Sequence, residues 1–528
     1  MNADHGTTGV RRIFWVFLII LLGLGLRLSA FKWGQGYAHF GAWDSLEAYI
    51  FAVDYAHGDP RAQYLGQPNF NSGAKLPGPL WSIFCLGGIR LGGSIEGVIM
   101  AIILLSTATI YLTFLLAERT IGPCYSLWAA WFAATLPFPV YYSVFVYNPN
   151  VMPFLGALLF LALWEVTQRD RSRAIFWVGF LLLLMPQFHL SVLSLLPAVA
   201  IILSISSRRL NIGLLAGGAA AGLLLYVPYL RGEMSNGWQN TLAMSSGRAG
   251  HWWGGLKALL APVNILADFV PQWTRSRSFL EYRELGNFCF GWFGVLLALN
   301  AVAVAVALFL IARSAHDIVG AMRGFWQSPR ARFRSSPGII FLALVTVPPL
   351  LFTTISRQSF HVRYSIVLLA PLLALAGYAT GQWISSRTGR RFFLVALTIS
   401  TCGNLWFIPS LYRYQARRID QGTVFLGSFR NLERVYQTLK AHAGAGRNVQ
   451  VDDATYVKGL VAEDRTYRDA ALIRPYVATR EKETRTSWIS YPARPLVYTV
   501  HWSDQVTNDA ADVAYVGHGI ALVLERLP

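Results

Sequence analysis

The chain has 528 residues, of which 54% are hydrophobic, 14% aromatic and only 14% charged. Soluble domains carry roughly a quarter charged residues, so this composition excludes an ordinary cytosolic enzyme, a disordered regulator and a nucleic-acid reader. A mean hydropathy of +0.42 with a net charge of +18 instead indicates an integral membrane protein. The four cysteines form no CxxC pair, which gives no sign of a disulfide framework or a zinc site.

Apolar segments long enough to cross a membrane recur along residues 1–410. A hydrocarbon core of about 30 Å needs roughly 20 apolar residues per helix, which predicts about eleven transmembrane helices. The segment 174–206 is predicted as a hairpin of two short spans, because Pro186 interrupts it and a single helix would be about 50 Å long. The predicted spans cover 13–30, 97–117, 124–142, 149–167, 174–187, 189–206, 211–230, 289–312, 338–355, 362–383 and 392–410.

Arginines in the short loops predict the orientation, because Lys and Arg resist translocation. They fall on one side throughout, from Arg11 and Arg12 to Arg390 and Arg391. We therefore expect a multi-pass protein of a bacterial inner membrane, with a cytoplasmic N-terminus and a periplasmic or extracellular C-terminal segment. The first span is expected to be retained rather than cleaved as a signal peptide, because Arg27 lies just before the potential cleavage site.

Three large segments are predicted outside the membrane: 31–96, 231–288 and everything after 411. In the first, acidic and apolar residues between Trp43 and Tyr55 separate onto two helical faces, which predicts an amphipathic helix on the membrane surface. The apolar stretch 80–91 is too short to span and is predicted to be re-entrant or interfacial.

The composition changes sharply after the last predicted span. Charges of both signs are interspersed and apolar runs shrink to strand length, which predicts a soluble α/β domain over 411–528 behind a transmembrane domain over 1–410. A helix is expected at 431–442, and strands are expected at 448–451, 496–500, 513–516 and 520–524.

Few ionisable residues lie within the predicted spans. Arg27, Glu165 and His189 are the clear cases, and their positions near span ends predict contact with water or headgroups. A carrier coupled to protons or ions normally needs several such groups inside the membrane, so their scarcity disfavours that class.

The outer loops combine acids with bases. Asp44 and Glu47 supply carboxylates and Lys75 a cation at the level of the membrane surface. A carboxylate can act as a general base toward a hydroxyl, and a cation can stabilise a departing phosphate. Such chemistry suits a substrate with a phosphate at the lipid headgroup.

Short sequence elements in these loops resemble a known family. They are Trp43-Asp44-Ser45-Leu46-Glu47, then Lys75-Leu76-Pro77-Gly78-Pro79-Leu80, and His361-Val362-Arg363-Tyr364 at the start of a span. Their order, with the C-terminal α/β segment, resembles the membrane glycosyltransferases of the GT-C class, in particular the family of protein O-mannosyltransferases and the aminoarabinose transferase acting on lipid A.

The resemblance implies an inverting transferase that uses a polyprenyl-phosphate-linked sugar, with membrane lipids and an envelope acceptor as partners and no nucleic acid. Asp44 would be the general base, with Glu47 as the alternative. Lys75 would hold the lipid phosphate. The acceptor stays open among lipid A, a glycan, a lipid and a protein. The other residues implied at the donor headgroup are Arg363, Tyr364, His361 and Arg357.

No cofactor is predicted. Where relatives often place a further acid, this chain has Tyr147-Asn148-Pro149-Asn150, which removes a potential metal ligand and leaves metal dependence open. Possible contacts to the sugar or acceptor are His189, Asn148, Asn150, His251 and Trp252.

Alternatives remain open at this point. His189 either caps its hairpin or touches the sugar. A flippase or exporter of lipid-linked sugars predicts a polar path through the spans. A non-catalytic envelope scaffold predicts that the outer acids and bases do not converge.

Overall fold

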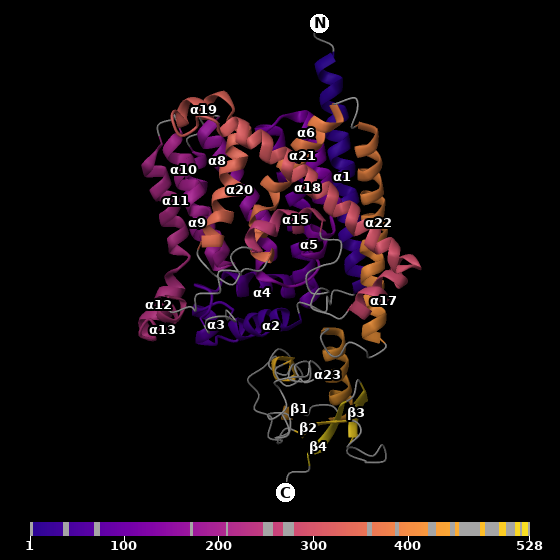
Figure 1. The fold of residues 1–528 in the computed structure, drawn as a ribbon. Coiled ribbons are helices and arrows are strands. Elements are labelled where there is room, and N and C mark those ends of the chain that lie inside the picture. Colours follow the sequence, from indigo (N-terminus) through magenta and orange to yellow (C-terminus); the bar gives the residue numbers. More distant parts are fainter. Residues whose placement is uncertain are drawn as a thin grey trace.

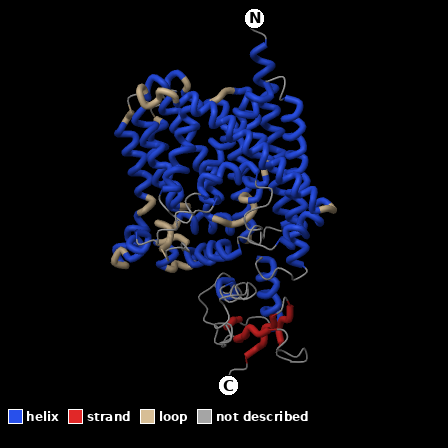
Figure 2. The backbone as a smooth tube through the Cα atoms, viewed as in Figure 1, coloured by secondary structure: helices blue, strands red, loops and turns tan. Residues whose placement is uncertain are grey.

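The computed structural model shows a helical bundle with a small sheet beyond one end of it (Figure 1). Figure 2 shows that helix dominates and that the strands are confined to the C-terminal part. The structure describes residues 4–34, 42–67, 74–168, 173–206, 210–245, 257–267, 279–355, 362–385, 390–420, 429–443, 449–452, 476–480, 496–502, 513–517 and 520–525.

Seven apolar helices in the described part of the chain are long enough to cross a membrane. They lie at Arg11–Lys32, Ile95–Thr120, Asn148–Gln168, Phe293–Met322, Pro337–Ile355, Ser365–Ile384 and Leu394–Tyr414. They belong to α1 (Asp4–Gly34), α5 (Ile95–Thr120), η2 (Asn148–Val151) with α8 (Met152–Gln168), α18 (Phe293–Met322), α20 (Pro337–Ile355), η6 (Val362–Leu368) with α21 (Leu369–Ser385), and α22 (Arg390–Asp420).

The four other predicted spans correspond to interrupted helices, so the count of eleven stays a prediction. Prolines lie at each interruption, where the missing N–H ends the helical ladder. One pair, α11 and α12, bends by 53°. These helices are α6 (Pro123–Thr135) and α7 (Pro137–Tyr141), α9 (Ala174–Leu184) with η3 (Met185–Gln187), η4 (Leu190–Leu195) with α10 (Leu196–Ile205), and α11 (Ile212–Leu224) with α12 (Val227–Ser235).

Arg27 is fully buried, so the prediction that water or headgroups reach it is wrong. Its guanidinium donates to Ser106 Oγ at 2.9 Å and to the carbonyl oxygens of Ala133 and Ala134 at 3.0 and 3.4 Å. Pro137 has no N–H to donate to the Ala133 carbonyl four residues earlier, so the end of α6 needs another donor. Arg27 supplies it from α1 and joins α1, α5 and α6.

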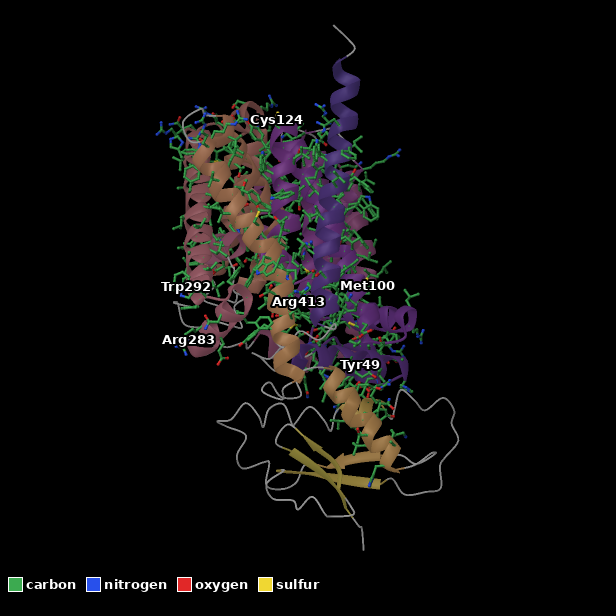
Figure 3. All side chains as sticks on the ribbon, turned by 90° about the vertical axis from the view of Figure 1, so that its right-hand side faces the viewer. Tyr49, Met100, Cys124, Arg283, Trp292 and Arg413 are labelled. Atoms are coloured by element: carbon green, nitrogen blue, oxygen red, sulfur yellow. The ribbon has the colours of Figure 1, made fainter. Side chains whose placement is uncertain are left out.

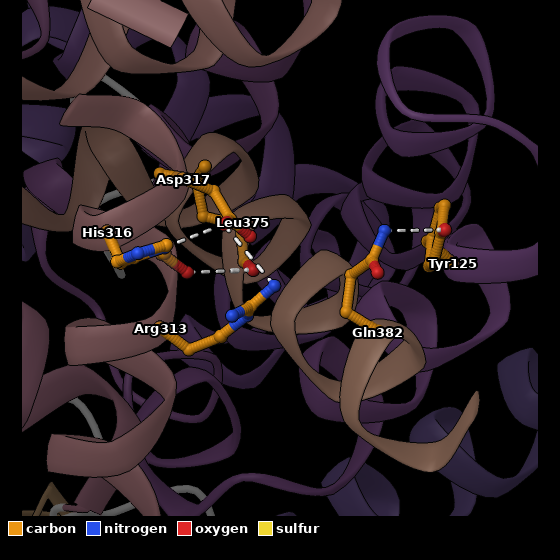
Figure 4. Close-up of polar contacts among 7 residues, drawn as sticks. Tyr125, Arg313, His316, Asp317, Leu375 and Gln382 are labelled. Atoms are coloured by element: carbon orange, nitrogen blue, oxygen red, sulfur yellow. Dashed lines mark hydrogen bonds and ion pairs between the residues drawn. The ribbon is translucent and has the colours of Figure 1, made fainter. Parts of the chain in front are cut away.

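Ion pairs join helices at the end of the bundle near the N-terminus. Arg119 on α5 lies 2.7 Å from Glu165 on α8, which explains how a carboxylate is buried inside an apolar helix. A further ion pair lies within α18, where Asp317 pairs with Arg313 one turn earlier at 3.3 Å (Figure 4). In the same view Gln382 on α21 donates to Tyr125 Oη on α6 at 3.0 Å.

Short helices lie across the other end, which we call the α2 end (Figure 1). The predicted surface helix is α2 (Ala42–Ala56), and the predicted non-spanning stretch is α4 (Leu80–Gly92). The described part of the chain also contains the short helices α3 (Pro60–Tyr64), α13 (Gln239–Ser245), η5 (Lys257–Leu260), α15 (Ala261–Ala267) and α17 (Phe279–Phe290), as well as α19 (Pro329–Ser335) at the opposite end of the bundle.

The C-terminal part contains α23 (Phe429–Ala443) and a four-stranded sheet in the order β1-β2-β4-β3. β1 and β2 are parallel, which requires a long crossover, and the other pairs are antiparallel. The strands β1 (Val449–Asp452), β2 (Leu496–Trp502), β3 (Val513–Gly517) and β4 (Ile520–Glu525) lie within two residues of the predicted ones. That 411–528 forms a separate soluble domain stays a prediction, and α22 continues unbroken through 411 to Asp420.

Candidate active site at the α2 end

Helix α2 presents two functional faces. Glu47 and Phe51 are four residues apart and therefore share one face, whereas Ser45 and Tyr49 share another. The Ser45 hydroxyl donates to the carbonyl of Val146 at 2.7 Å and fixes α2 to the loop before η2. Leu46, Ala48, Ala52 and Val53 are buried and anchor the helix to the bundle.

Glu47 belongs to a row of hydrogen-bonded side chains that the sequence analysis did not predict. Gln67 donates through Nε2 to Glu47 Oε2 at 3.2 Å and accepts through Oε1 from Trp81 Nε1 at 3.0 Å. Gln67 and Trp81 are both buried, so they fix the direction of the carboxylate. Asp44 lies one turn earlier in α2, three residues from Glu47, which places both backbone positions on one side of the helix. The side chain of Asp44 is outside the described residues.

Lys75 lies on the same side of α2. Gly66 N–H donates to the Leu76 carbonyl at 2.9 Å and Leu76 N–H donates to the Gln67 carbonyl at 3.0 Å, so two segments pair like short strands. This pairing ties Lys75 to Gln67, the partner of Glu47. Lys75 Nζ lies 5.1 Å from the centre of the Phe51 ring, a cation–π contact with the Glu47 face. The structure therefore brings Glu47 and Lys75 to one face of α2.

The Lys75 ammonium is partly buried. Burial lowers its pKa, and the nearby Arg61 guanidinium lowers it further, whereas Asp59 and Asp54 oppose the shift without cancelling it. An anion bound at this nitrogen would stabilise the charged form. The arrangement therefore suits an anionic ligand better than a neutral one.

Asn240 is a second residue that sequence reasoning missed. Its Oδ1 accepts from the backbone N–H of Lys75 at 2.6 Å, and its Nδ2 donates to the Lys75 carbonyl at 3.1 Å. The Tyr229 hydroxyl accepts from the same Nδ2 at 3.3 Å. No motif surrounds Asn240 in the sequence, so no pattern could have singled it out.

The bend between α11 and α12 explains how Asn240 reaches Lys75. After the bend, α12 packs on α3, where Gly232 is so close to Tyr64 that an added Cβ would lie 2.5 Å from Tyr64 Cβ. Glu233 on α12 accepts from the N–H of Thr241 at 2.7 Å and fixes the start of α13. The segment that contains α12 and α13 thus holds the segment that contains α3 and Lys75.

The segment Pro77-Gly78-Pro79, which follows Lys75, packs on η3. Gly78 has a φ of +130° and lies against Gln187, whose Oε1 an added Cβ would meet at 2.2 Å. Gln187 is completely buried, and neither polar atom of its side chain has a hydrogen-bond partner in the described structure. Sequence reasoning missed Gln187, although it lies two residues before the predicted contact His189.

Of the predicted sugar or acceptor contacts, three lie in the described part of the chain and two lie outside it. Asn148 Nδ2 donates to the Phe188 carbonyl at 2.7 Å, and Asn150 Nδ2 donates to the Phe145 carbonyl at 2.9 Å. His189 Nδ1 accepts from the N–H of Ser191 at 3.1 Å and caps η4. This is the capping role that the sequence left open beside contact with the sugar. His251 and Trp252 lie outside the described residues.

The predicted headgroup residues are described only in part. Arg363 and Tyr364 lie in η6, which contacts η2, the element that begins at Asn148, and η4, the element that His189 caps. Their side chains, and the whole of His361 and Arg357, are outside the described residues. Within the described part of the chain no cluster of three or more His, Cys, Asp or Glu residues has the geometry of a metal site.

Comparison with known proteins gives a fold. No family model and no curated protein sequence matches the chain. The structure of ArnT from Cupriavidus metallidurans bound to undecaprenyl phosphate matches with a TM-score of 0.57 at 12% identity, covering 97% of this chain and 98% of that chain.

The apo state of the same ArnT matches with a TM-score of 0.55 at 11% identity over the same shares of both chains. The apo oligosaccharyltransferase of Archaeoglobus fulgidus matches with a TM-score of 0.43 at 12% identity, covering 92% of this chain and 62% of that chain. The resemblance to the GT-C class and its aminoarabinose transferase is therefore confirmed for the fold, and along almost its whole length the chain has the fold of ArnT.

Proposed function

We propose that the chain is a membrane glycosyltransferase that moves a sugar from a polyprenyl-phosphate donor to an envelope acceptor at the α2 end. The observation that supports it most is the placement of Glu47 and Lys75 on one face of α2, linked through Gln67. A carboxylate and a partly buried cation are the two groups that such a transfer needs. The ArnT structure with the same fold holds undecaprenyl phosphate.

The proposed step is a single displacement. Asp44 or Glu47 takes the proton of an acceptor hydroxyl, and the hydroxyl oxygen forms a bond to the anomeric carbon as the bond from that carbon to the phosphate oxygen breaks. The electron pair of the broken bond stays on the lipid phosphate, next to Lys75 and Arg363. Attack from the face opposite the leaving phosphate inverts the anomeric centre.

The remaining assignments follow from the family resemblance. Tyr364, His361 and Arg357 would line the donor headgroup, and Asn148 and Asn150 would shape the sugar side through the loop they brace. The α2 end would face the periplasm of a bacterial inner membrane, as the arginine distribution predicts.

The test is transfer from radiolabelled polyprenyl-phosphate sugars to membrane acceptors by the purified protein in nanodiscs. We expect Lys75→Met to weaken donor binding and to lower turnover, because it removes the cation and keeps the length of the side chain. Asp44→Asn and Glu47→Gln, tested separately, identify the base by a loss of at least about a hundredfold in kcat. Wild-type turnover in both variants would contradict the mechanism.

A flippase is the competing function. The described structure does not favour it, since buried Arg27 is bound by carbonyls and Glu165 is paired with Arg119 rather than lining a path. Movement of a lipid-linked sugar across proteoliposomes without any transfer would favour it over the transferase.

A further inference from the structure

The C-terminal part of the chain touches the helix that carries the candidate bases. Tyr476 lies in a helical segment, 476–480, and its ring stacks on Tyr49 of α2 with 5.9 Å between ring centres and 28° between planes. Both tyrosines are buried. Tyr49 follows Glu47 by two residues, so this contact forms on another face of α2 than the Glu47 face that Lys75 contacts. Figure 3 shows Tyr49 at the end of the bundle next to α23.

Glu433 on α23 holds Tyr476 in this position. The Tyr476 hydroxyl donates to Glu433 Oε2 at 2.5 Å. Arg480 donates through Nε to Oε2 at 3.0 Å and through Nη2 to Oε1 at 2.9 Å, a bidentate pair. Gln437 donates to Oε1 at 2.7 Å. We call these four residues the Glu433 clasp.

The Glu433 clasp lies next to the buried apolar face of α23. Leu432, Val435, Tyr436 and Leu439 form the buried face of α23, and the Arg480 guanidinium lies 5.5 Å from the centre of the Tyr436 ring. Burial and the hydrogen bond to Glu433 both raise the pKa of Tyr476, so its hydroxyl keeps its proton and remains a donor. Contacts within the C-terminal part therefore fix the position of Tyr476.

Helix α2 is held from two sides. The pair Gln67 and Lys75 contacts the Glu47 face, and Tyr476 contacts the Tyr49 face. The Ser45 hydrogen bond and the buried residues of α2 anchor the helix to the bundle, and Tyr476 adds a contact from the C-terminal part. A misplacement of about 1 Å at a reacting group can cost about a hundredfold in rate.

We infer that Tyr476, set by the Glu433 clasp, is a positioning residue for the carboxylates of α2. The inference rests on the proposed function. The C-terminal part then helps to set the geometry of the active site.

Steady-state transfer kinetics test this role. We expect Tyr476→Ala to lower kcat at least about tenfold with the donor KM changed less than about twofold, because the base moves while the phosphate site stays. Tyr476→Phe keeps the stacked ring and should retain more activity than Tyr476→Ala. His442→Ala, at the exposed end of α23, is the matched control and should behave as wild type. Equal kcat values for Tyr476→Ala and wild type would overturn the inference.

Cross-linking separates this inference from the proposed function. Cys124 and Cys402 are the exposed cysteines, so Tyr49→Cys with Tyr476→Cys is placed in a Cys124→Ser, Cys402→Ser background and treated with a short bis-maleimide. Efficient intramolecular cross-linking is expected, and its absence would overturn the contact. If the wild type transfers no sugar although the cross-link forms, the proposed function is wrong. If it transfers sugar and Tyr476→Ala matches it, only the positioning role is wrong.

Discussion

Asn240 holds both backbone polar groups of Lys75, although 165 residues separate the two in sequence. The carboxamide accepts from the Lys75 N–H and donates to the Lys75 carbonyl, as a neighbouring strand would. Helix α13, which carries Asn240, thereby fixes the backbone of Lys75, the candidate phosphate-binding residue.

Asn240→Ala should weaken the binding of a polyprenyl phosphate about tenfold, because two backbone hydrogen bonds of roughly 1 kcal/mol each are lost and Lys75 is freed. Isothermal titration with undecaprenyl phosphate in detergent measures the change. Gln239→Ala replaces the exposed neighbour and serves as the control. Equal affinities for Asn240→Ala and the control would show that Lys75 does not depend on this contact.

The local elements were predictable because they depend on local patterns. The faces of α2 follow from helical periodicity, and the four strands follow from short apolar runs between turn residues. Four predicted spans proved harder, because prolines divide apolar segments that hydropathy alone reads as continuous.

The site was predictable only in part. Glu47 and Lys75 lie in short sequence elements that resemble a known family. Gln67 and Asn240 act through contacts between residues far apart in the sequence, which no sequence spacing predicts. Arg27 was misjudged because its position near a span end suggested water, whereas its actual partners are the Ser106 hydroxyl and carbonyls at the end of α6. One of these is the Ala133 carbonyl, which Pro137 leaves without a donor. Such partners are set by tertiary packing and are invisible in one sequence.

Gln187→Met should raise the thermal unfolding temperature of the ligand-free protein. The buried carboxamide has no hydrogen-bond partner in the described structure, and such a group costs about 1–3 kcal/mol, which an apolar side chain of similar size avoids. Differential scanning fluorimetry in detergent checks this. Leu193→Met, on the exposed side of η4, is a control for adding methionine. A lower unfolding temperature for Gln187→Met would mean that the amide is satisfied in the native protein.

Arg27→Met should destabilise the bundle by about 2 kcal/mol or more, because the carbonyls of Ala133 and Ala134 lose their donor inside the protein. Arg27→Lys keeps a cation with fewer, shorter-reaching donors and should lie between Arg27→Met and wild type. Thermal unfolding in detergent ranks the three proteins. Unchanged stability of Arg27→Met would show that water or lipid replaces the guanidinium.

The Glu433 clasp should weaken in acid. Burial would raise the pKa of Glu433, but the hydrogen bonds from Arg480, Tyr476 and Gln437 outweigh it and hold the pKa below its usual value. A carboxyl whose folded pKa is depressed contributes stability above its unfolded pKa, about 4.3, and loses that contribution as the pH falls through the folded value.

The pH dependence is followed in proteins that keep Tyr476, by limited proteolysis of the C-terminal part with a protease active in acid. Glu433→Gln should be cleaved faster than wild type at pH 7, because the neutral amide no longer pairs with Arg480. The cleavage rates of the two proteins should converge as the pH falls through the folded pKa of Glu433, which lies below its usual value, because wild-type Glu433 then also becomes neutral. A difference that persists unchanged at low pH would show that the charge of Glu433 does not hold the clasp.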